Sequence, residues 1–387
     1  MKKRLLSIVL LIALFMTLLP ASVFALDEID GWVYVRDSGH LKEALSNTYV
    51  NKIRFANHIM IDKKGIVINE KKTSLVIDGQ GYTLTDYPSN SSSDAIRLIT
   101  SSSLKVITIQ NMDILGMNSS GTFWVRDSST MVRTKLIFKD VNYTGPHMVD
   151  NPRGTVEIHD STAYLHLGYS KSYGEVAEAS NVVLGGKVDI AKYQPKRDDE
   201  IFKITKDAHG GVEILPNANV TVDNAKNEKR KSRGFAYMGV AHGKFIVGDG
   251  ATLNYDGFNS FIQGYSLVDA SIGENAYVYV TTKEDFAGCD GQIEIKGDFR
   301  VGKGSTLRMV AESNKKRQPI LQLKRTGQIV FDSPKEVLLA NSSNNKTYKD
   351  YFLSTGPYGC DVNITMYGIK RLEYWHWWRP WGADIHN

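Results

Sequence analysis

The chain has 387 residues and a formal net charge of +5 at pH 7. It is therefore not strongly basic, its charge gives no reason to invoke nucleic acid, and we expect no such partner. Its two cysteines have no histidine at metal-ligand spacing, which excludes a cysteine-based zinc site.

Residues 1–25 are typical of a secretory signal peptide. A basic start at Lys2, Lys3 and Arg4 precedes an apolar run from residue 5 to residue 19, and small residues end at Ala25. We expect cleavage after Ala25; the alternative is an uncleaved membrane anchor. Cleavage would lower the net charge of +5 by three, to +2. Because no later stretch is apolar enough to span a membrane, we predict a secreted, extracellular protein, free or held at the cell surface.

The mature chain opens with a short apolar segment, Trp32 to Val35, and then a predicted helix. Leu41, Ala44 and Leu45 have the i, i+3, i+4 spacing of one helical face, and Ser38 is the expected N-cap. One amphipathic helix at this point can cover the open end of a stacked sheet, which would otherwise expose apolar side chains.

A repeated strand pattern begins near residue 53. Apolar residues recur at offsets 0, 2, 5 and 7, as in Ile107-Ile109-Met112-Ile114, Leu136-Phe138-Val141-Tyr143 and Val156-Ile158-Ser161-Ala163. Asn111, Asp140 and Asp160 at offset 4 suit a tight bend between two strands. Val183, Val188 and Ile190, around a Gly-Gly pair, look like an irregular fourth copy.

A second template, with offsets 0, 2, 6, 8 and 10, governs the later rungs. Its copies are Val212-Ile214-Ala218-Val220-Val222, Phe245-Val247-Ala251-Leu253-Tyr255, Ala270-Ile272-Ala276-Val278-Val280 and Phe299-Val301-Ser305-Leu307-Met309. Asn217, Gly250, Asn275 and Gly304 precede the second run, which indicates a left-handed turn residue in every copy. The pattern continues through Ile329, Phe331, Val337 and Leu339. Repeats of strand and turn at this length predict an all-β stacked solenoid with a short amino-terminal capping helix.

Three polar features lie between the rungs. The basic loop Lys226 to Arg233 is a solvated loop or a contact for an anionic polymer, and we favour the former. The acidic run at 198–200 is expected to be solvated. His209 and His242 lie in matching Ala-His-Gly stretches. They could stack on adjacent rungs within reach of a metal. We favour the alternative that they only happen to fall at the same phase of the repeat, in turns.

Residues 346–387 form an aromatic-rich carboxy-terminal segment. Trp375, Trp377, Trp378, Arg379 and Trp381 crowd together there. They either cover the last rung as a cap, which we favour, or form a ligand-binding surface, since Trp and Arg are frequent interface anchors. Cys289 and Cys360 are either bridged, as an exported protein permits, or free thiols.

The motifs that carry known catalytic chemistry are missing from the sequence. There is no Gly-rich phosphate loop with a lysine, no Gly-x-Ser-x-Gly elbow and no tight group of Asp and Glu on one rung. We therefore predict no catalytic residue, no metal and no cofactor.

Several structural motifs carry a resemblance to a known family. They are Trp32 to Val35 with the following helix, Ile77-Asp78-Gly79-Gln80-Gly81, Val247-Gly248-Asp249-Gly250-Ala251, Val301-Gly302-Lys303-Gly304-Ser305 and Ile329-Val330-Phe331-Asp332-Ser333-Pro334. Over roughly residues 26–345 the chain resembles the pectate-lyase-like adhesive domain of surface and secreted proteins of Gram-positive bacteria. The resemblance implies a right-handed parallel β-helix that serves in adhesion. The Arg-x-Pro-x-x-Arg element of true pectate lyases is absent, because Arg317-Gln318-Pro319 continues with Ile320, Leu321 and Gln322.

These observations favour a non-catalytic adhesin that recognises a glycan or an extracellular surface protein. Two alternatives stay open. One is a polysaccharide lyase or glycoside hydrolase of the same fold, and the other is a structural spacer or assembly subunit without a ligand of its own.

Overall fold

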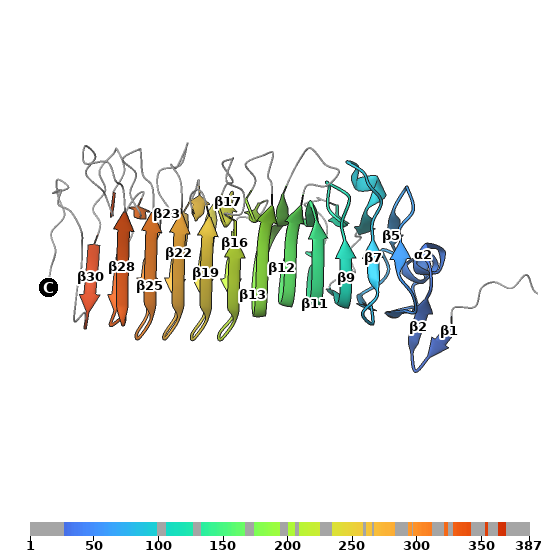
Figure 1. Cartoon of the computed structure of the whole chain (residues 1–387), viewed down its shortest axis with the longest axis horizontal. Coiled ribbons are helices and arrows are strands. Elements are labelled where there is room, and N and C mark those ends of the chain that lie inside the picture. The colour runs from blue at the N-terminus through green and yellow to red at the C-terminus, as the bar shows by residue number, and fades with distance from the viewer. Residues whose placement is uncertain are drawn as a thin grey trace, which may run out of the picture.

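A computed structural model describes residues 27–98, 106–126, 133–166, 174–193, 200–205, 209–224, 234–257, 261–264, 267–282, 293–295, 297–311, 321–323, 328–341, 353–354 and 363–368. The described chain is an elongated coil in which strands of successive turns lie side by side (Figure 1). Each turn contributes short strands to up to three lateral faces, and the strands of each face pair in parallel with those of the next turn.

The first face consists, in chain order, of β2 (Trp32–Val35), β3 (Lys52–Phe55), β6 (Ser74–Asp78), the first part of β9 (Val106–Leu115) and of β11 (Lys135–Gly145), the middle of β12 (His147–His166) and of β13 (Glu175–Tyr193), β15 (His209–Ile214), β18 (His242–Val247), β21 (Leu267–Ile272), β24 (Phe299–Val301), β27 (Gln328–Asp332) and β30 (Asn363–Tyr367). The second face consists of β4 (Ile59–Met60), β7 (Thr83–Thr85), the ends of β9, β11, β12 and β13, then β16 (Asn219–Asp223), β19 (Thr252–Gly257), β22 (Tyr277–Thr282), β25 (Thr306–Ala311) and β28 (Glu336–Asn341). The third face consists of β5 (Ile66–Ile68), β8 (Ile96–Leu98), β10 (Phe123–Val125), the starts of β12 and β13, then β14 (Phe202–Ile204), β17 (Ala236–Met238), β20 (Ile262–Gly264), β23 (Ile293–Ile295), β26 (Leu321–Leu323) and β29 (Leu353–Ser354).

One continuous apolar core fills the coil because alternate residues of every strand point inward. The residues that the two templates place inside are buried, among them Ile107, Ile109, Phe138, Val247, Leu253, Val278 and Leu307. Burying one such side chain contributes about 1.5–3 kcal/mol relative to leaving it exposed. The predicted all-β solenoid is confirmed.

The amino-terminal end is covered by a hairpin and a helix. Strand β1 (Asp27–Ile29) pairs antiparallel with β2, and helix α2 (Ser38–Ser46) buries Leu41, Ala44 and Leu45 as predicted. The expected cap residue is wrong by one position: the side chain of Asp37 accepts a hydrogen bond from the His40 N–H, and Ser38 is the first helical residue. A short 3₁₀ helix, Ser92–Asp94, lies farther along.

The corner between the first and second faces is built on left-handed residues, as the second template predicted; in the first template, the predicted tight bends at Asn111, Asp140 and Asp160 also have positive φ. Positive φ is found at Gln80, Asn111, Asp140, Asp160, Gly186, Asn217, Gly250, Asn275, Gly304, Ser333 and Gly368. These residues occupy the same place in successive turns, so they form a ladder along one edge of the coil, which we call the corner ladder.

The templates change at β13, and there one prediction is wrong. Val183 points outward, and Val182 and Leu184 are the buried pair that precedes Val188. Against β12 the register shifts after His159, because β13 carries one more residue before the strand resumes. This rung is therefore intermediate: between the two buried runs it has one residue more than the first template, and, because Val182 and Val188 pair with Val212 and Val220, two residues fewer than the second.

Several predicted features lie outside the described residues. They are the signal peptide, Cys289 and Cys360, the basic loop at 226–233, and the tail residues Trp375, Trp377, Trp378, Arg379 and Trp381. Within the described ranges, no helix has the length and apolar character needed to cross a membrane.

Candidate functional site

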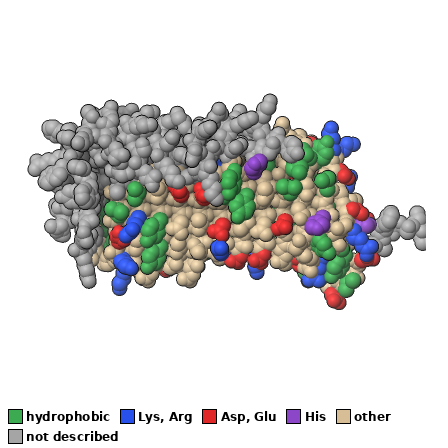
Figure 2. All heavy atoms as spheres, in the orientation of Figure 1, with side chains coloured by type: hydrophobic (Ala, Val, Ile, Leu, Met, Phe, Trp, Pro, Cys, Tyr) green, Lys and Arg blue, Asp and Glu red, His purple; other side chains and the backbone are tan. Residues whose placement is uncertain are grey.

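The three faces present different chemistry to solvent. The second face, seen in Figure 2, is mostly neutral, because Thr and Asn occupy many of its outward positions. A shallow hollow of about 510 Å³ lies there between Tyr279, Asn254 and the in-register carboxylates of Asp223 and Asp256. Asp223 and Asp256 have further partners inside the protein, so we regard this hollow as the lesser candidate.

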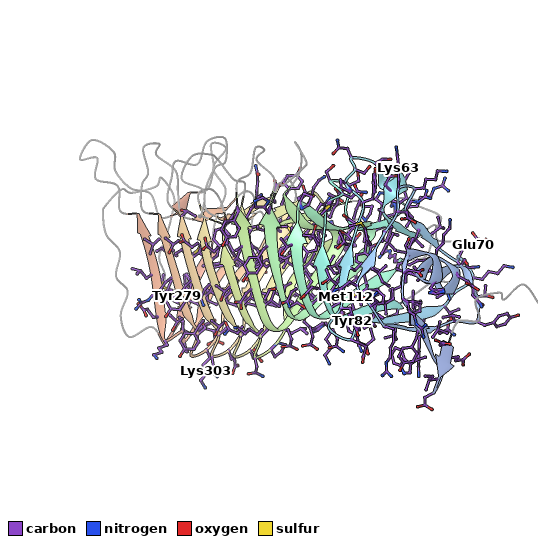
Figure 3. The ribbon with its side chains drawn as sticks, turned by 45° about the vertical axis from the view of Figure 1, so that its right-hand side comes forward. Lys63, Glu70, Tyr82, Met112, Tyr279 and Lys303 are labelled. Carbon is purple, nitrogen blue, oxygen red and sulfur yellow. The ribbon has the colours of Figure 1, made fainter. Side chains whose placement is uncertain are left out.

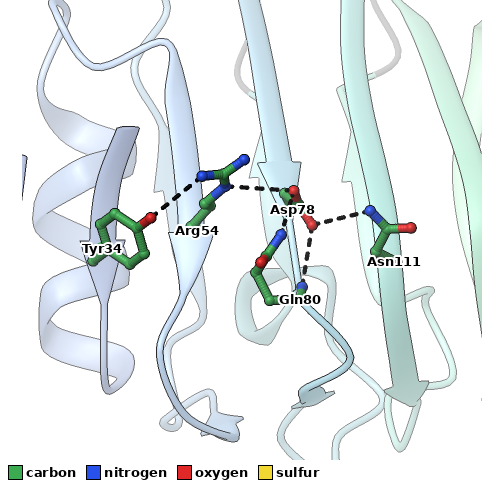
Figure 4. Close-up of polar contacts among 5 residues, drawn as sticks. All are labelled: Tyr34, Arg54, Asp78, Gln80 and Asn111. Carbon is green, nitrogen blue, oxygen red and sulfur yellow. Dashed lines mark hydrogen bonds and ion pairs between the residues drawn. The ribbon is translucent and has the colours of Figure 1, made fainter. Parts of the chain in front are cut away.

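The amino-terminal part of the first face carries a polar network that crosses four strands (Figure 4). Arg54 donates to the Tyr34 hydroxyl at 3.3 Å, lies 3.6 Å from the Asp78 carboxylate and packs 4.1 Å from the ring centre of Trp32. Burial alone would raise the pKa of Asp78, but hydrogen bonds from Gln80 and Asn111 outweigh it and lower that pKa. Because Arg54 and Asp78 are paired across adjacent strands, the network stabilises the first rungs, although Arg54 Nε itself has no hydrogen-bond acceptor among the described residues.

The third face carries a single row of chemically rich side chains. Each central residue of its three-residue strands points outward, and parallel pairing places these residues directly beside one another on successive turns. The row, which we call the third-face row, runs through Arg97, Trp124, Asp150, Glu178, Lys203 and Tyr237. Neighbours in such a row are separated by the strand spacing of about 4.8 Å. All six side chains are half-buried.

The centre of the row is an ion pair. Lys203 Nζ lies 2.7 Å from Glu178 Oε2, and the Thr205 hydroxyl donates to Glu178 Oε1 at 3.1 Å. Burial would lower the pKa of Lys203, but the carboxylates of Glu175, Glu178 and Glu200 raise it above its ordinary value. Lys203 is therefore a fixed cation and not a general base.

Glu175 and Glu200 are both buried beside this pair. The expectation that the acidic run at 198–200 is solvated is thus wrong for Glu200, because this residue faces the charged cluster. His147 is buried nearby: its Nε2 lies 2.9 Å from the Val149 carbonyl oxygen, and burial lowers its pKa. The centre of the row is consequently a charge cluster in which Lys203 lies among the carboxylates of Glu175, Glu178 and Glu200.

The ends of the row hold the groups best suited to a ligand. Arg97 Nε is buried and lacks a hydrogen-bond acceptor among the described residues. Trp124 lies beside Arg97 in the row, and Tyr237 stands four strand spacings beyond Trp124, about 19 Å away. Aromatic rings pack against the C–H faces of sugars, while guanidinium and carboxylate groups bond their hydroxyls.

The row fits binding better than metal chemistry. Among the described residues, no group of three or more His, Cys, Asp or Glu has the geometry to hold a metal ion. Asp150 and Glu178 are in-register neighbours, so two carboxylate side chains extend from adjacent strands on the same face.

The structure places the two histidines of the Ala-His-Gly stretches next to each other. His209 and His242 pair in register, and their rings stack with centroids 5.1 Å apart and an interplanar angle of 17°. The stacking named in the alternative is therefore observed, at positions of equal repeat phase, and a metal at this pair stays a hypothesis.

The third-face row escaped prediction because its residues are far apart in sequence and its strands are very short. A signal does exist: each outward residue stands between two apolar ones, as in Ile96-Arg97-Leu98, Phe123-Trp124-Val125 and Phe202-Lys203-Ile204. Aligning these triplets by repeat phase would have assembled the row.

Comparison with known proteins agrees with this architecture. Residues 32–150 match the family model described as "Putative pectate lyase-like adhesive domain", which confirms the family resemblance over that segment. The solved structure of "L. reuters 100-23 SRRP" is similar, with 14% sequence identity and a TM-score of 0.63, over 88% of this chain and 100% of that chain. "L. reuteri 53608 SRRP" matches at 14% identity over 86% of this chain and 98% of that chain, with a TM-score of 0.39. No curated protein matches the chain.

Proposed function

We propose that this protein is an extracellular adhesin that binds a glycan without catalysing a reaction, and that the third-face row is its contact surface. The observation that carries the proposal is the alignment of Arg97, Trp124 and Tyr237 with the central charge cluster on one face of the coil. A rigid row of this kind suits an extended polymer, since many weak contacts can add along it.

Two further observations support adhesion. The amino-terminal rungs match an adhesive domain, and the coil has the fold of an SRRP structure. In addition, Lys203 and Glu178 at the centre of the row are engaged with each other in an ion pair, which suits a fixed binding surface better than proton transfer. The tail residues from Trp375 to Trp381 stay a proposed second contact or cap.

A glycoside hydrolase is the second candidate, and the neighbouring Asp150 and Glu178 favour it. Carboxyl groups about 5–5.5 Å apart are the arrangement of retaining glycosidases. Against it, both carboxylate oxygens of Glu178 already have partners, Lys203 and Thr205.

The adhesion proposal is tested on an array of plant, mucin and bacterial cell-wall glycans. We expect the mature wild-type chain to bind at least one glycan, and Arg97→Met or Tyr237→Ala to weaken that binding at least tenfold. Tyr164→Ala is the matched aromatic control, because Tyr164 is 42% exposed on the second face. Equal binding by Tyr237→Ala, Arg97→Met and wild type would remove the row from the proposal.

The hydrolase candidate is tested on the same preparation. Polygalacturonate, alginate, hyaluronan and the bound glycan are incubated with the protein, with and without calcium, and assayed for new reducing ends and for unsaturated products. We expect no product above a heat-inactivated control. If the wild-type protein forms product and Glu178→Gln does not, the protein is a hydrolase and the non-catalytic proposal is wrong.

A further inference from the structure

A second hollow lies on the first face, around β15 and β18. It has a volume of about 200 Å³ and is bordered by Asn181, His209, Glu213, His242 and Lys244. Strand register explains its shape. Asn181, Gly211 and Lys244 are neighbours in one column, so the hollow is the place where a side chain is missing.

A glycine keeps the hollow open. A Cβ added to Gly211 would collide with the Lys244 carbonyl oxygen. This neighbour is a backbone atom, which cannot move aside without disturbing the sheet. The gap is therefore a fixed feature of the fold.

The walls of the hollow differ in chemistry. On one side the stacked imidazoles of His209 and His242 form a flat surface. Outward positions two residues along a strand lie about 6.6 Å apart, so Glu213 stands on the opposite side of Gly211 from His209. Val183 and Ile246 flank Glu213 in its column and add an apolar border.

The polar groups of the walls are available to a ligand. Lys244 and Glu213 are exposed, and neither has an ion pair or hydrogen bond from its side chain within the described part of the chain. One contributes a positive charge and the other a negative charge, so the hollow has balanced charge with donors and acceptors on facing sides.

We propose that this hollow is a subsite for a single neutral hexose unit of a glycan. The C–H face of the ring packs on the imidazole pair, as sugars do on aromatic surfaces. Lys244 and Asn181 donate to hydroxyl oxygens, and Glu213 accepts from hydroxyl groups. A volume of about 200 Å³ is comparable to that of one hexose ring. The balanced charge favours a neutral sugar over a uronic acid or an amino sugar.

The experiment follows the histidine ring protons by NMR while D-galactose, D-glucose or D-mannose is added to the mature chain. The chain has nine histidines, and the signals of His209 and His242 are assigned by their loss in His209→Gln and His242→Gln. We expect at least one hexose to shift these two signals selectively, with a dissociation constant in the millimolar range. Glu213→Gln and Lys244→Met should each weaken that binding at least fivefold.

Matched controls separate this site from general charge effects. Lys303→Met and Glu274→Gln remove exposed charges at the edge of the coil, where Figure 3 shows Lys303, and should leave hexose binding unchanged. The proposal is overturned if no hexose shifts either histidine signal, if Glu213→Gln and Lys244→Met both bind like wild type, or if only glucuronate or glucosamine shifts the signals.

The subsite goes beyond the proposed function and stands independently of it. Arg97→Met and Tyr237→Ala alter the third face, so they should not change the histidine shifts produced by the hexose. Array binding like wild type by these two variants, with hexose binding intact, would contradict the third-face row alone, whereas loss of the histidine shifts with intact array binding would contradict the subsite alone.

Discussion

The amino-terminal and carboxy-terminal rungs turn the same corner by different means. In β9, β11 and β12 the strand runs through the corner, and the left-handed residue is Asn111, Asp140 or Asp160. From β15 onward the strand breaks and a tight turn forms, as where the Ala251 N–H donates to the Gly248 carbonyl oxygen. Through β13, Val156 and Ala163 align with Val212 and Val222, so a span of seven positions becomes one of ten. Three inserted residues per rung therefore convert a bent strand into a strand–turn–strand unit.

The longer turn of the late rungs also changes which residues the corner ladder tolerates. In the early rungs the Asn111 amide donates to Asp78 of the preceding turn, so successive side chains can coexist. In the later rungs the side chain of Asn217 lies against Gly250, and that of Asn275 lies against Gly304. The late half thus needs a glycine at every second turn, and the early half does not.

The largest expected effect comes from a charge in the late core. Leu253 is fully buried, and Leu253→Asp should destabilise the fold by several kcal/mol because an unpaired carboxylate is forced among apolar side chains. We expect loss of the cooperative melting transition by circular dichroism. Thr252→Asp, on the outward side of the same strand, is the control and should melt like wild type. An unchanged transition in Leu253→Asp would contradict the inward direction of Leu253.

A smaller effect should separate the two kinds of corner. Gly250 has φ +67°, and a Cβ there would lie 2.6 Å from Asn217 Oδ1. Gly250→Asn should therefore cost about 1–3 kcal/mol, measured by denaturant unfolding. Gly81→Asn is the matched change in the early half. Gly81 also has positive φ, +80°, but has no atom within 4 Å of its Cβ position, so only the backbone preference is lost.

Equal destabilisation by Gly250→Asn and Gly81→Asn would mean that backbone strain alone sets the cost. In that case the contact with Asn217 would have no part in the glycine requirement. Restoration of stability in the double variant Asn217→Gly, Gly250→Asn would support the contact directly.

The smallest effect concerns acidity in the early half. Burial raises the pKa of Asp86 to about 6, against hydrogen bonds donated by the Thr122 hydroxyl and the Met117 and Asn118 N–H groups. The folded state then binds a proton more tightly than the unfolded state. Lowering the pH from 7 to 5 should accordingly stabilise wild type by about 1 kcal/mol relative to Asp86→Asn.

His147 acts in the opposite direction, because its lowered pKa makes the folded protein lose stability as pH falls below about 6.5. His147 is present in both proteins, so the difference in stability between wild type and Asp86→Asn at each pH isolates the contribution of Asp86. Asp140→Asn, an exposed change at the corner, is the control. Parallel pH profiles for wild type and Asp86→Asn would show that Asp86 keeps its ordinary acidity in the fold.

Most of the architecture could be predicted because it depends on local periodicity. Inward residues such as Leu253 and turn residues such as Asn217 can be recognised from the spacing of residues within one repeat. The third-face row could not be predicted in this way. Its strands have three residues, too few for a period to show, and its chemistry arises only when Trp124 and Lys203, on different turns, are stacked by the loops between them. Val183 was misplaced for a related reason, since a single inserted residue reverses inside and outside in a strand.

The alternation along the corner ladder also bears on how this coil could lengthen or shorten. In this part of the ladder, a residue with a side chain alternates with glycine: Asp160, Gly186, Asn217, Gly250, Asn275, Gly304, Ser333 and Gly368. Excising one turn from this half would set two side chains, or two glycines, in contact, whereas excising two adjacent turns would leave every junction with its present partner. The unit of duplication, deletion or transplantation in this half is therefore a pair of turns, and variants of graded length are best shortened by that interval.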